Sequence, residues 1–294
     1  MKSINMPKQT TIKVKHDAEL LDYIMEATGK KRTAVKSLFA HSQIFVDGKN
    51  VSKYNFAVRQ NQVITINSVG VSQNEIDKSQ LKIIFEDDSI IVIDKPTGIL
   101  SVSTGNADEI TACSILRNYV KNNSAGNKIF IVHRLDRETS GLMLFAKTER
   151  VKMILQSNWD KIVLQRRYVA VVEGKMQNDS QSIVSYLKQN SAMQMYVSKN
   201  DENAKRAVLT YQTLKKNNQY SLIEVELETG RKNQIRVQMQ EIGHSIAGDK
   251  KYGGKSSPIG RLALHAKTLE FIHPITRETM CFTTKIPKKF LTVF

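Results

Sequence analysis

The sequence predicts an α+β protein built from two unequal units. Three observations lead to this class. A small set of short helices and strands over residues 1–70 is followed by a polar stretch at 71–80 and by a larger set over 81–294. In the larger set, short apolar runs at hairpin spacing alternate with a few helical patterns, which favours a mixed, largely antiparallel sheet flanked by helices. The length of 294 residues is long for one domain and short for three.

The N-terminal unit contains two predicted helices. In the segment DAELLDYIMEAT (17–28) the apolar residues recur at helical spacing. Asp17 is placed to cap this helix and Gly29 to end it. A second apolar pattern predicts a helix over residues 33–40. The unit is therefore expected to be an α+β unit with a helical pair.

Short strands complete this unit. Residues 10–15 and 62–67 alternate apolar and polar side chains, and IFVDGKNV (44–51) predicts a hairpin through its Asp-Gly pair. Residues 1–70 carry a net charge of +6, which either faces solvent or contacts an acidic partner. Part of this charge gathers at the second helix, at Lys30, Lys31, Arg32 and Lys36.

The larger unit is predicted to combine strands and helices. The segment LKIIFEDDSIIVIDKPTG (81–98) indicates two strands around an acidic turn, followed by a second turn. Helices are expected near residues 110–121 and 148–161. Between 220 and 227, Ile, Val and Leu alternate with glutamates, which is typical of an antiparallel strand with one buried face. Two more strands are expected, at 166–174 and 207–214.

Composition limits the class of protein. Lys and Arg total 44 against 28 Asp and Glu, so the net charge is +16 and the pI about 9.7. This balance favours a nucleic-acid partner, although a solvated basic surface would give the same numbers. Cys113 and Cys281 stand in no metal-binding pattern, so no metal is expected. No leader, lipidation motif or membrane-length apolar run is visible, so we expect a cytoplasmic protein without a membrane partner.

The segment IVHRLDRETSGLMLFAKT (131–148) places a charged centre between two apolar runs. Taken alone, Asp136 would pair with Arg134 or Arg137 in an exposed ion pair worth ~0–1 kcal/mol. A Ser-His-Asp triad with His133 is not favoured, because triad members usually come from separate parts of a fold and ETSGL is not a G-x-S-x-G elbow.

This segment closely resembles the HRLDxxTSGL motif of the RluA-type family of RNA pseudouridine synthases. Four further segments resemble motifs of that family in the same order, so the resemblance covers residues 81–294 and implies a pseudouridine synthase catalytic domain. The four segments are EDDSIIVIDKPTGIL (86–100), RRYVAVVEG (166–174), TGRKNQIRVQMQEIGHSIAGDKKYGG (229–254) and RLALHAKTLEFIHPITRE (261–278).

The N-terminal unit resembles the ribosomal-protein-S-four-type (alpha-L) RNA-binding domain. The stretches that carry this likeness are residues 20–49 and the closing strand VITI (63–66). Such a domain recurs in the same synthase family. The resemblance implies an RNA-binding domain over 1–70, a linker over 71–80 and a catalytic domain over 81–294. The basic residues implied to face RNA are Lys31, Arg32 and Lys36.

The resemblance implies conversion of a uridine in RNA to pseudouridine. The bond from ribose C1′ to uracil N1 breaks, and C1′ rejoins the base at C5. By the family's motifs Asp136 is the catalytic aspartate, Tyr168 the active-site tyrosine and Arg236 the partner of the aspartate. An ionised carboxylate can attack the sugar, attack the base or accept a proton, and all three roles stay open. Atoms are neither gained nor lost, so no cofactor is expected.

A uridine in a helix must leave its base stack before it can react. By resemblance, Arg134 would fill the vacated space, although a plain phosphate contact would suit it equally. His133 would orient its loop, and Leu264 would line the uracil pocket or simply belong to the core. Binding to RNA should fall steeply with salt. Further candidates for phosphate contacts are Lys95, Arg231, Lys232, Lys250 and Lys251.

The sequence departs from the family pattern at two places. Lys232 and Asn233 stand where the family commonly has Thr-His, and SVST (101–104) stands where it has His-Pro. These departures put local hydrogen bonding and substrate preference in question. The segment DKKYGGKS (249–256) is a near miss to a P-loop, because Asp249 stands where the first glycine is needed.

Two other functions remain as alternatives. One is a non-catalytic RNA-binding or ribosome-assembly factor, and the presence of Asp136, Tyr168 and Arg236 argues against it. The other is a transfer-RNA pseudouridine synthase. The two-domain arrangement favours ribosomal RNA of the large subunit as the substrate, and we expect a monomer.

Overall fold

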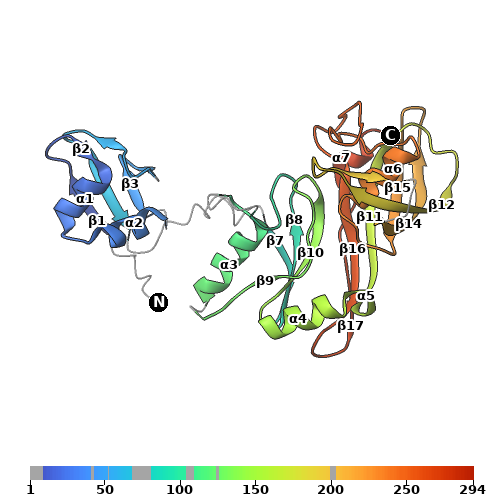
Figure 1. Cartoon of the computed structure of the whole chain (residues 1–294), viewed down its shortest axis with the longest axis horizontal. Coiled ribbons are helices and arrows are strands. Elements are labelled where there is room, and N and C mark those ends of the chain that lie inside the picture. Colours follow the sequence, from blue (N-terminus) through green and yellow to red (C-terminus); the bar gives the residue numbers. More distant parts are fainter. Residues whose placement is uncertain are drawn as a thin grey trace. The chain divides into compact units, whose positions relative to one another are not determined.

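The computed structural model separates the chain into two compact units, residues 1–79 and 80–294, and each is described here by itself (Figure 1). The predicted linker at 71–80 lies outside the described residues. The residues that the structure describes are 9–40, 43–51, 53–67, 81–103, 109–123, 126–198 and 203–294.

The first unit packs two helices, α1 (Leu20–Thr28) and α2 (Arg32–Ala40), on an antiparallel sheet. Leu20, Val35 and Ile64 are wholly buried in one apolar cluster that joins both helices to the sheet. The strands in order are β1 (Gln9–Lys13), β6 (Val63–Asn67), β3 (Ile44–Val46) and β4 (Lys49–Asn50), and β2 (Ala18–Glu19) pairs with β5 (Ala57–Val58).

One end of helix α1 follows the sequence prediction and the other does not. Gly29 ends the helix at a φ of 67°, as predicted. The predicted cap at Asp17 is wrong, because Glu19 precedes the helix and no side chain caps it. The intervening residues join strand β2, and the Asp17 carboxylate accepts a hydrogen bond from the backbone of Gln60 at 2.7 Å instead.

The second unit is built on an 11-stranded sheet, and among its described strand pairs only β10 and β16 run parallel. The predicted mixed, largely antiparallel sheet is therefore confirmed. The strands in order are β13 (Met195–Val197), β12 (Ser180–Gln189), β14 (Lys205–Lys216), β15 (Tyr220–Leu227), β11 (Val163–Glu173), β16 (Leu264–Ile272), β10 (Ser140–Ala146), β8 (Ile90–Lys95) and β7 (Lys82–Glu86); β17 (Thr279–Thr283) pairs with β16, and β9 (Phe130–Ile131) with β10.

The helices of this unit are short. The single helix predicted over 148–161 is wrong in one respect, because it breaks at Asn158, whose side-chain amide donates to the carbonyl of Ile154 at 3.0 Å. Among the described residues no helix is long and apolar enough to cross a membrane. The helices are α3 (Ala112–Asn123), α4 (Glu149–Ser157), α5 (Trp159–Ile162), α6 (Gln234–Glu241) and α7 (Lys288–Leu291).

A glycine joins the two halves of the large sheet. Gly141 on β10 pairs with Ala266 on β16, and Ala266 pairs on its other side with Tyr168 on β11. Gly141 has a φ of 114°, and a Cβ there would lie 2.2 Å from the carbonyl oxygen of Ala266. Only glycine permits this approach. The junction therefore brings the loop before β10 level with Tyr168.

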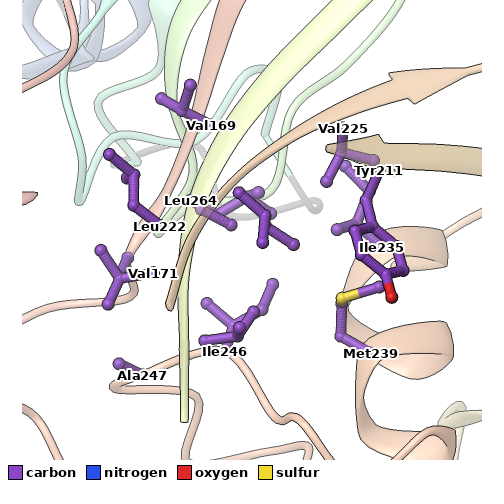
Figure 2. Close-up of a cluster of buried hydrophobic side chains, with 14 of the residues drawn as sticks. Val169, Val171, Tyr211, Leu222, Val225, Ile235, Met239, Ile246, Ala247 and Leu264 are labelled. Carbon is purple, nitrogen blue, oxygen red and sulfur yellow. The ribbon is translucent and has the colours of Figure 1, made fainter. Parts of the chain in front are cut away.

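The main apolar core fixes helix α6 against the sheet. Figure 2 shows Ile235 and Met239 projecting from this helix beside Tyr211 of β14. These two residues are one helical turn apart, so they share a face, and both are buried. Arg236 lies between these two residues in the sequence of helix α6. The packing of Ile235 and Met239 therefore fixes the direction in which the Arg236 side chain leaves the helix.

Candidate active site

The loop that carries Asp136 is held by hydrogen bonds on both sides of this residue. Before it, the hydroxyl of Ser101 donates to the carbonyl of Leu135 at 2.7 Å and accepts from the Leu135 N–H at 3.0 Å. After it, the N–H of Gly98 donates to the carbonyl of Arg137 at 2.9 Å. The segment after strand β8 thus acts as a clamp on the Asp136 loop.

Lys95 is part of this clamp. It is wholly buried, and its ammonium donates to the carbonyls of Pro96 (2.9 Å), Ile99 (2.8 Å) and Arg137 (3.3 Å). Burial lowers the pKa of Lys95 to about 8. The prediction that Lys95 contacts RNA phosphate is wrong, because the ammonium has no solvent-facing surface and its three donors are used within the protein.

His133 supports the same loop. Its Nε2 accepts a hydrogen bond from the backbone N–H of Leu144 at 3.0 Å, and its ring packs on Trp159 with centroids 4.9 Å apart. Burial, assisted by the charge of Arg166, lowers the pKa of His133 to about 3. The imidazole is therefore neutral, and its two contacts hold it between strand β10 and helix α5.

Arg236 binds two carboxylates at once. Its Nη1 lies 3.0 Å from Oδ2 of Asp136, while Nε and Nη2 each lie 2.7 Å from an oxygen of Asp249. Burial alone would lower the pKa of Arg236, but the hydrogen bonds and charges of Asp249 and Asp136 outweigh it and raise the pKa. The guanidinium is therefore a permanent charge fixed beside Asp136, the residue whose partner it is by the family resemblance.

Asn233 is a contact that the sequence prediction missed. Its amide nitrogen donates to Oδ2 of Asp136, and its amide oxygen accepts from the hydroxyl of Tyr252 at 3.1 Å. It stands immediately before helix α6 with a φ of 53°. Asn233 lies in the same segment as Arg236, so its position was visible in the sequence. Its contacts with Asp136 and Tyr252 were not visible there.

A pocket opens in front of Asp136. Burial raises the pKa of Tyr168, with the charge of Asp136 adding to the rise and Arg166 opposing it, so the phenol stays protonated. Leu264 is buried at the pocket wall. The lining brings together six of the predicted site residues, Arg134, Asp136, Tyr168, Arg231, Arg236 and Leu264, with Leu135, Thr139, Leu227, Asn233, Gln234 and Ile235.

Two hollows adjoin this pocket and share Arg231 with it. One holds His133, Arg134 and Arg166. The other holds no acidic residue, and its basic residues are Lys188, Lys205, Arg231 and Lys232. The sequence prediction missed Arg166, Lys188 and Lys205, because a basic residue on a strand gives no signal of the distant segments that lie beside it.

The remaining predicted contacts lie elsewhere. Lys31, Arg32 and Lys36 are exposed on or beside helix α2 of the first unit. Arg32 also pairs with Asp22 at 3.3 Å, and both side chains are more than half exposed. Within the described parts of the chain, no group of three or more His, Cys, Asp or Glu residues could hold a metal ion.

Comparison with known proteins identifies the family of this chain. Residues 89–241 match the model of the family described as RNA pseudouridylate synthase. The Bacillus subtilis protein named "Uncharacterized RNA pseudouridine synthase YhcT" is 30% identical over 283 residues, which cover 94% of this chain and 92% of that relative. The ribosomal large subunit pseudouridine synthase D of Zymomonas mobilis is 33% identical over 236 residues, which cover 76% of this chain and 74% of the relative.

Solved structures show the same fold. The human RNA pseudouridylate synthase domain containing 4 superimposes with a TM-score of 0.59 at 22% identity, over 71% of this chain and 90% of that one. The human domain containing 1 gives a TM-score of 0.56 at 23% identity, over 70% and 83%. The chain therefore belongs to the RNA pseudouridylate synthase family and is an RNA pseudouridine synthase.

Proposed function

We propose that this enzyme isomerises specific uridines of large-subunit ribosomal RNA, with Asp136 as the group that reacts with a flipped-out uridine. One observation carries the proposal: Asp136 lies in a pocket with Tyr168 and Leu264, held by a guanidinium whose charge is permanent. Relatives named ribosomal large subunit pseudouridine synthase D, 33% and 35% identical to this chain, support the substrate class.

The pocket suits the chemistry of the isomerisation. The bond between C1′ and N1 breaks, the base turns, C1′ bonds to C5, and the hydrogen of C5 leaves as a proton. Asp136 supplies an anionic oxygen for attack or proton transfer, and Arg236 stabilises it. Because burial raises the pKa of Tyr168, its neutral phenol is better suited to packing its ring on uracil than to accepting a proton.

The pocket accepts one base that has left its stack. Flipping costs a few kcal/mol and is cheapest in loops and at mismatches. Arg134 is exposed at the pocket and is placed either to fill the vacated space or to bind a phosphate. Leu264 offers an apolar wall to the uracil ring.

The hollows that share Arg231 with the pocket give the RNA backbone a path on both sides of the target uridine. Arg134 and Arg166 serve one side, and Lys188, Lys205 and Lys232 the other. The first unit, with Lys31, Arg32 and Lys36, is proposed as an alpha-L type domain that adds affinity for folded RNA. Its proposed bounds are 1–70, with a linker at 71–80 and the catalytic domain at 81–294.

The decisive experiment is a pseudouridine map of total RNA from cells with and without this protein. We expect at least one large-subunit ribosomal pseudouridine to disappear with the protein and to fail to return when Asp136→Ala is supplied. The purified variant should still bind the RNA. A missing site in transfer RNA would reassign the substrate, and full modification by Asp136→Ala would end the assignment of Asp136.

The basic path has its own test. Replacing Lys188 and Lys205 together by Gln should flatten the plot of log binding constant against log salt by about 1.4, since each phosphate contact to single-stranded RNA contributes about 0.7. Turnover at saturating RNA should not change. The matched control is Lys121→Gln with Lys128→Gln, which line none of the three hollows. An equal slope for both double variants would remove these two lysines from the path.

A further inference from the structure

We infer that Asn233 is a positioning residue that selects Oδ1 of Asp136 as the reacting oxygen. The inference rests on the proposed reactive role of Asp136. Both side-chain donors that reach this carboxylate, Nη1 of Arg236 and Nδ2 of Asn233, contact the same oxygen, Oδ2. Within the described residues, no hydrogen-bond donor reaches Oδ1.

Two donors at one oxygen restrict the rotation of a carboxylate, which a single donor does not. A carboxylate held by a single hydrogen bond can turn about its Cβ–Cγ bond and exchange its oxygens. Arg236 comes from within helix α6, while Asn233 comes from the turn before it, so the pair fixes both the position and the plane of the Asp136 carboxylate. The lone pairs of Oδ1 are then left to face the base or sugar in the pocket.

The amide of Asn233 is itself held in one orientation. The hydroxyl of Tyr252 accepts the backbone N–H of Met195 at 3.2 Å and donates to the Asn233 oxygen at 3.1 Å. Tyr252 is wholly buried, so this order of donors is not disturbed by water. The amide oxygen therefore faces Tyr252, and the amide nitrogen faces Asp136.

The turn that presents Asn233 does not depend on its side chain. Gln234 is buried, and its amide oxygen accepts hydrogen bonds from the Arg231 N–H and from the hydroxyl of Thr229, each at 2.9 Å. Asn233 itself has a φ of 53°, a conformation that asparagine and glycine adopt readily. Replacement of Asn233 by glycine should therefore remove the amide and keep the backbone.

The test measures steady-state tritium release from a [5-³H]uridine transcript that carries the mapped target site. For Asn233→Gly we expect kcat to fall about 10- to 100-fold with KM within about twofold, because the lost bond orients a reacting charge rather than binding RNA. For Tyr252→Phe we expect a smaller fall in kcat. If Tyr252 acts through Asn233, the double variant should be no slower than Asn233→Gly alone.

The control for an Asn-to-Gly change in a left-handed turn is Asn61→Gly, whose φ is 74° and whose side chain is exposed in the first unit. A second variant, Asn233→Asp, keeps the turn and can still accept from Tyr252, but cannot donate to Asp136. Wild-type turnover in either Asn233 variant overturns the inference. So does a double variant whose fold-decrease in kcat equals the product of the two single-variant decreases. A wild-type protein that releases no tritium contradicts the proposed function instead.

Discussion

The two carboxylates bound to Arg236 differ in how much of their hydrogen-bonding capacity the fold uses. Asp249 is only 1% exposed, and it accepts two bonds from Arg236 and two from the backbone N–H groups of Lys251 and Tyr252. Asp136 has a side chain 28% exposed and receives its two side-chain donors at one oxygen.

On the proposed function, this difference separates a structural carboxylate, Asp249, from the reactive one, Asp136, around a shared cation. A group whose donors or acceptors are all engaged by the protein should affect mainly stability when it is replaced. A group with an unused acceptor facing a pocket should affect mainly turnover. Lys95, with three carbonyls on one ammonium, belongs with Asp249 in this respect.

The largest effect is expected for Asp136→Asn. The amide keeps an oxygen that can accept from Arg236 and Asn233, so the unfolding free energy should change by less than about 1 kcal/mol. Pseudouridine formation should fall by about 10⁴-fold or more, because the anionic oxygen is lost. Urea unfolding and tritium release measure the two quantities. A large loss of stability with retained turnover would reverse the comparison.

Asp249→Asn should show the opposite balance. The new amide nitrogen faces the guanidinium of Arg236, and this buried cation loses one of its two carboxylate partners, so the unfolding free energy should fall by about 3–5 kcal/mol. Turnover should fall less than for Asp136→Asn, since Arg236 keeps its contact with Asp136 but loses its anchor. The same two measurements apply, and an unchanged unfolding midpoint would show that Asp249 is not structural.

Much of the fold was predictable because local patterns specify it. The strand predicted at 220–227 is β15 at the same residues, since alternating side chains directly record a half-buried strand. Helix α6 was missed for a physical reason. It buries Gln234 and Gln238, so the polar residues do not mark its solvent face and the apolar periodicity is hidden.

The site was predictable only where a motif is contiguous. Asp136, Tyr168 and Arg236 each lie in a recognisable segment, and the structure brings all three to one pocket. The role of Asn233 depends on Asp136, 97 residues earlier, so no local pattern reports it. The burial of Lys95 depends likewise on the distant loop that it clamps, and a lone lysine in a sequence indicates only a charge.

Lys95→Met should have an intermediate effect. The substitution preserves length but leaves the carbonyls of Pro96, Ile99 and Arg137 without this donor. A single unsatisfied buried acceptor costs about 1–3 kcal/mol, while removal of a buried charge offsets part of the loss, so we expect a net fall of about 2–3 kcal/mol. Turnover should fall about tenfold because the Asp136 loop loosens. Denaturant unfolding of Lys95→Met, with the exposed Lys121→Met as control, measures the loss of unfolding free energy. Equal unfolding midpoints for the two variants would contradict the role of Lys95 in holding the Asp136 loop.

The smallest effect is expected at His265, whose two ring nitrogens are both engaged. Nδ1 lies 2.8 Å from the hydroxyl of Ser140, and Nε2 lies 2.8 Å from that of Thr284. Arg261 donates to the Ser140 oxygen, so its positive charge lies close to the ring and disfavours a second ring proton. Burial, assisted by Arg261, accordingly lowers the pKa of His265 from 6.5 to about 4.

This shift gives stability a defined pH dependence. Between pH 6.5 and 4 the unfolded chain binds a proton at His265 that the folded chain does not, so the stabilisation is complete above 6.5 and is lost as the pH falls. At pH 5 the loss should be about 2 kcal/mol relative to pH 7. His265→Gln can still bond both hydroxyls but cannot titrate, so its unfolding free energy should fall less between these two pH values while its turnover at pH 7 stays near wild type. Parallel pH curves for the two proteins would show that burial does not hold His265 neutral in the folded chain.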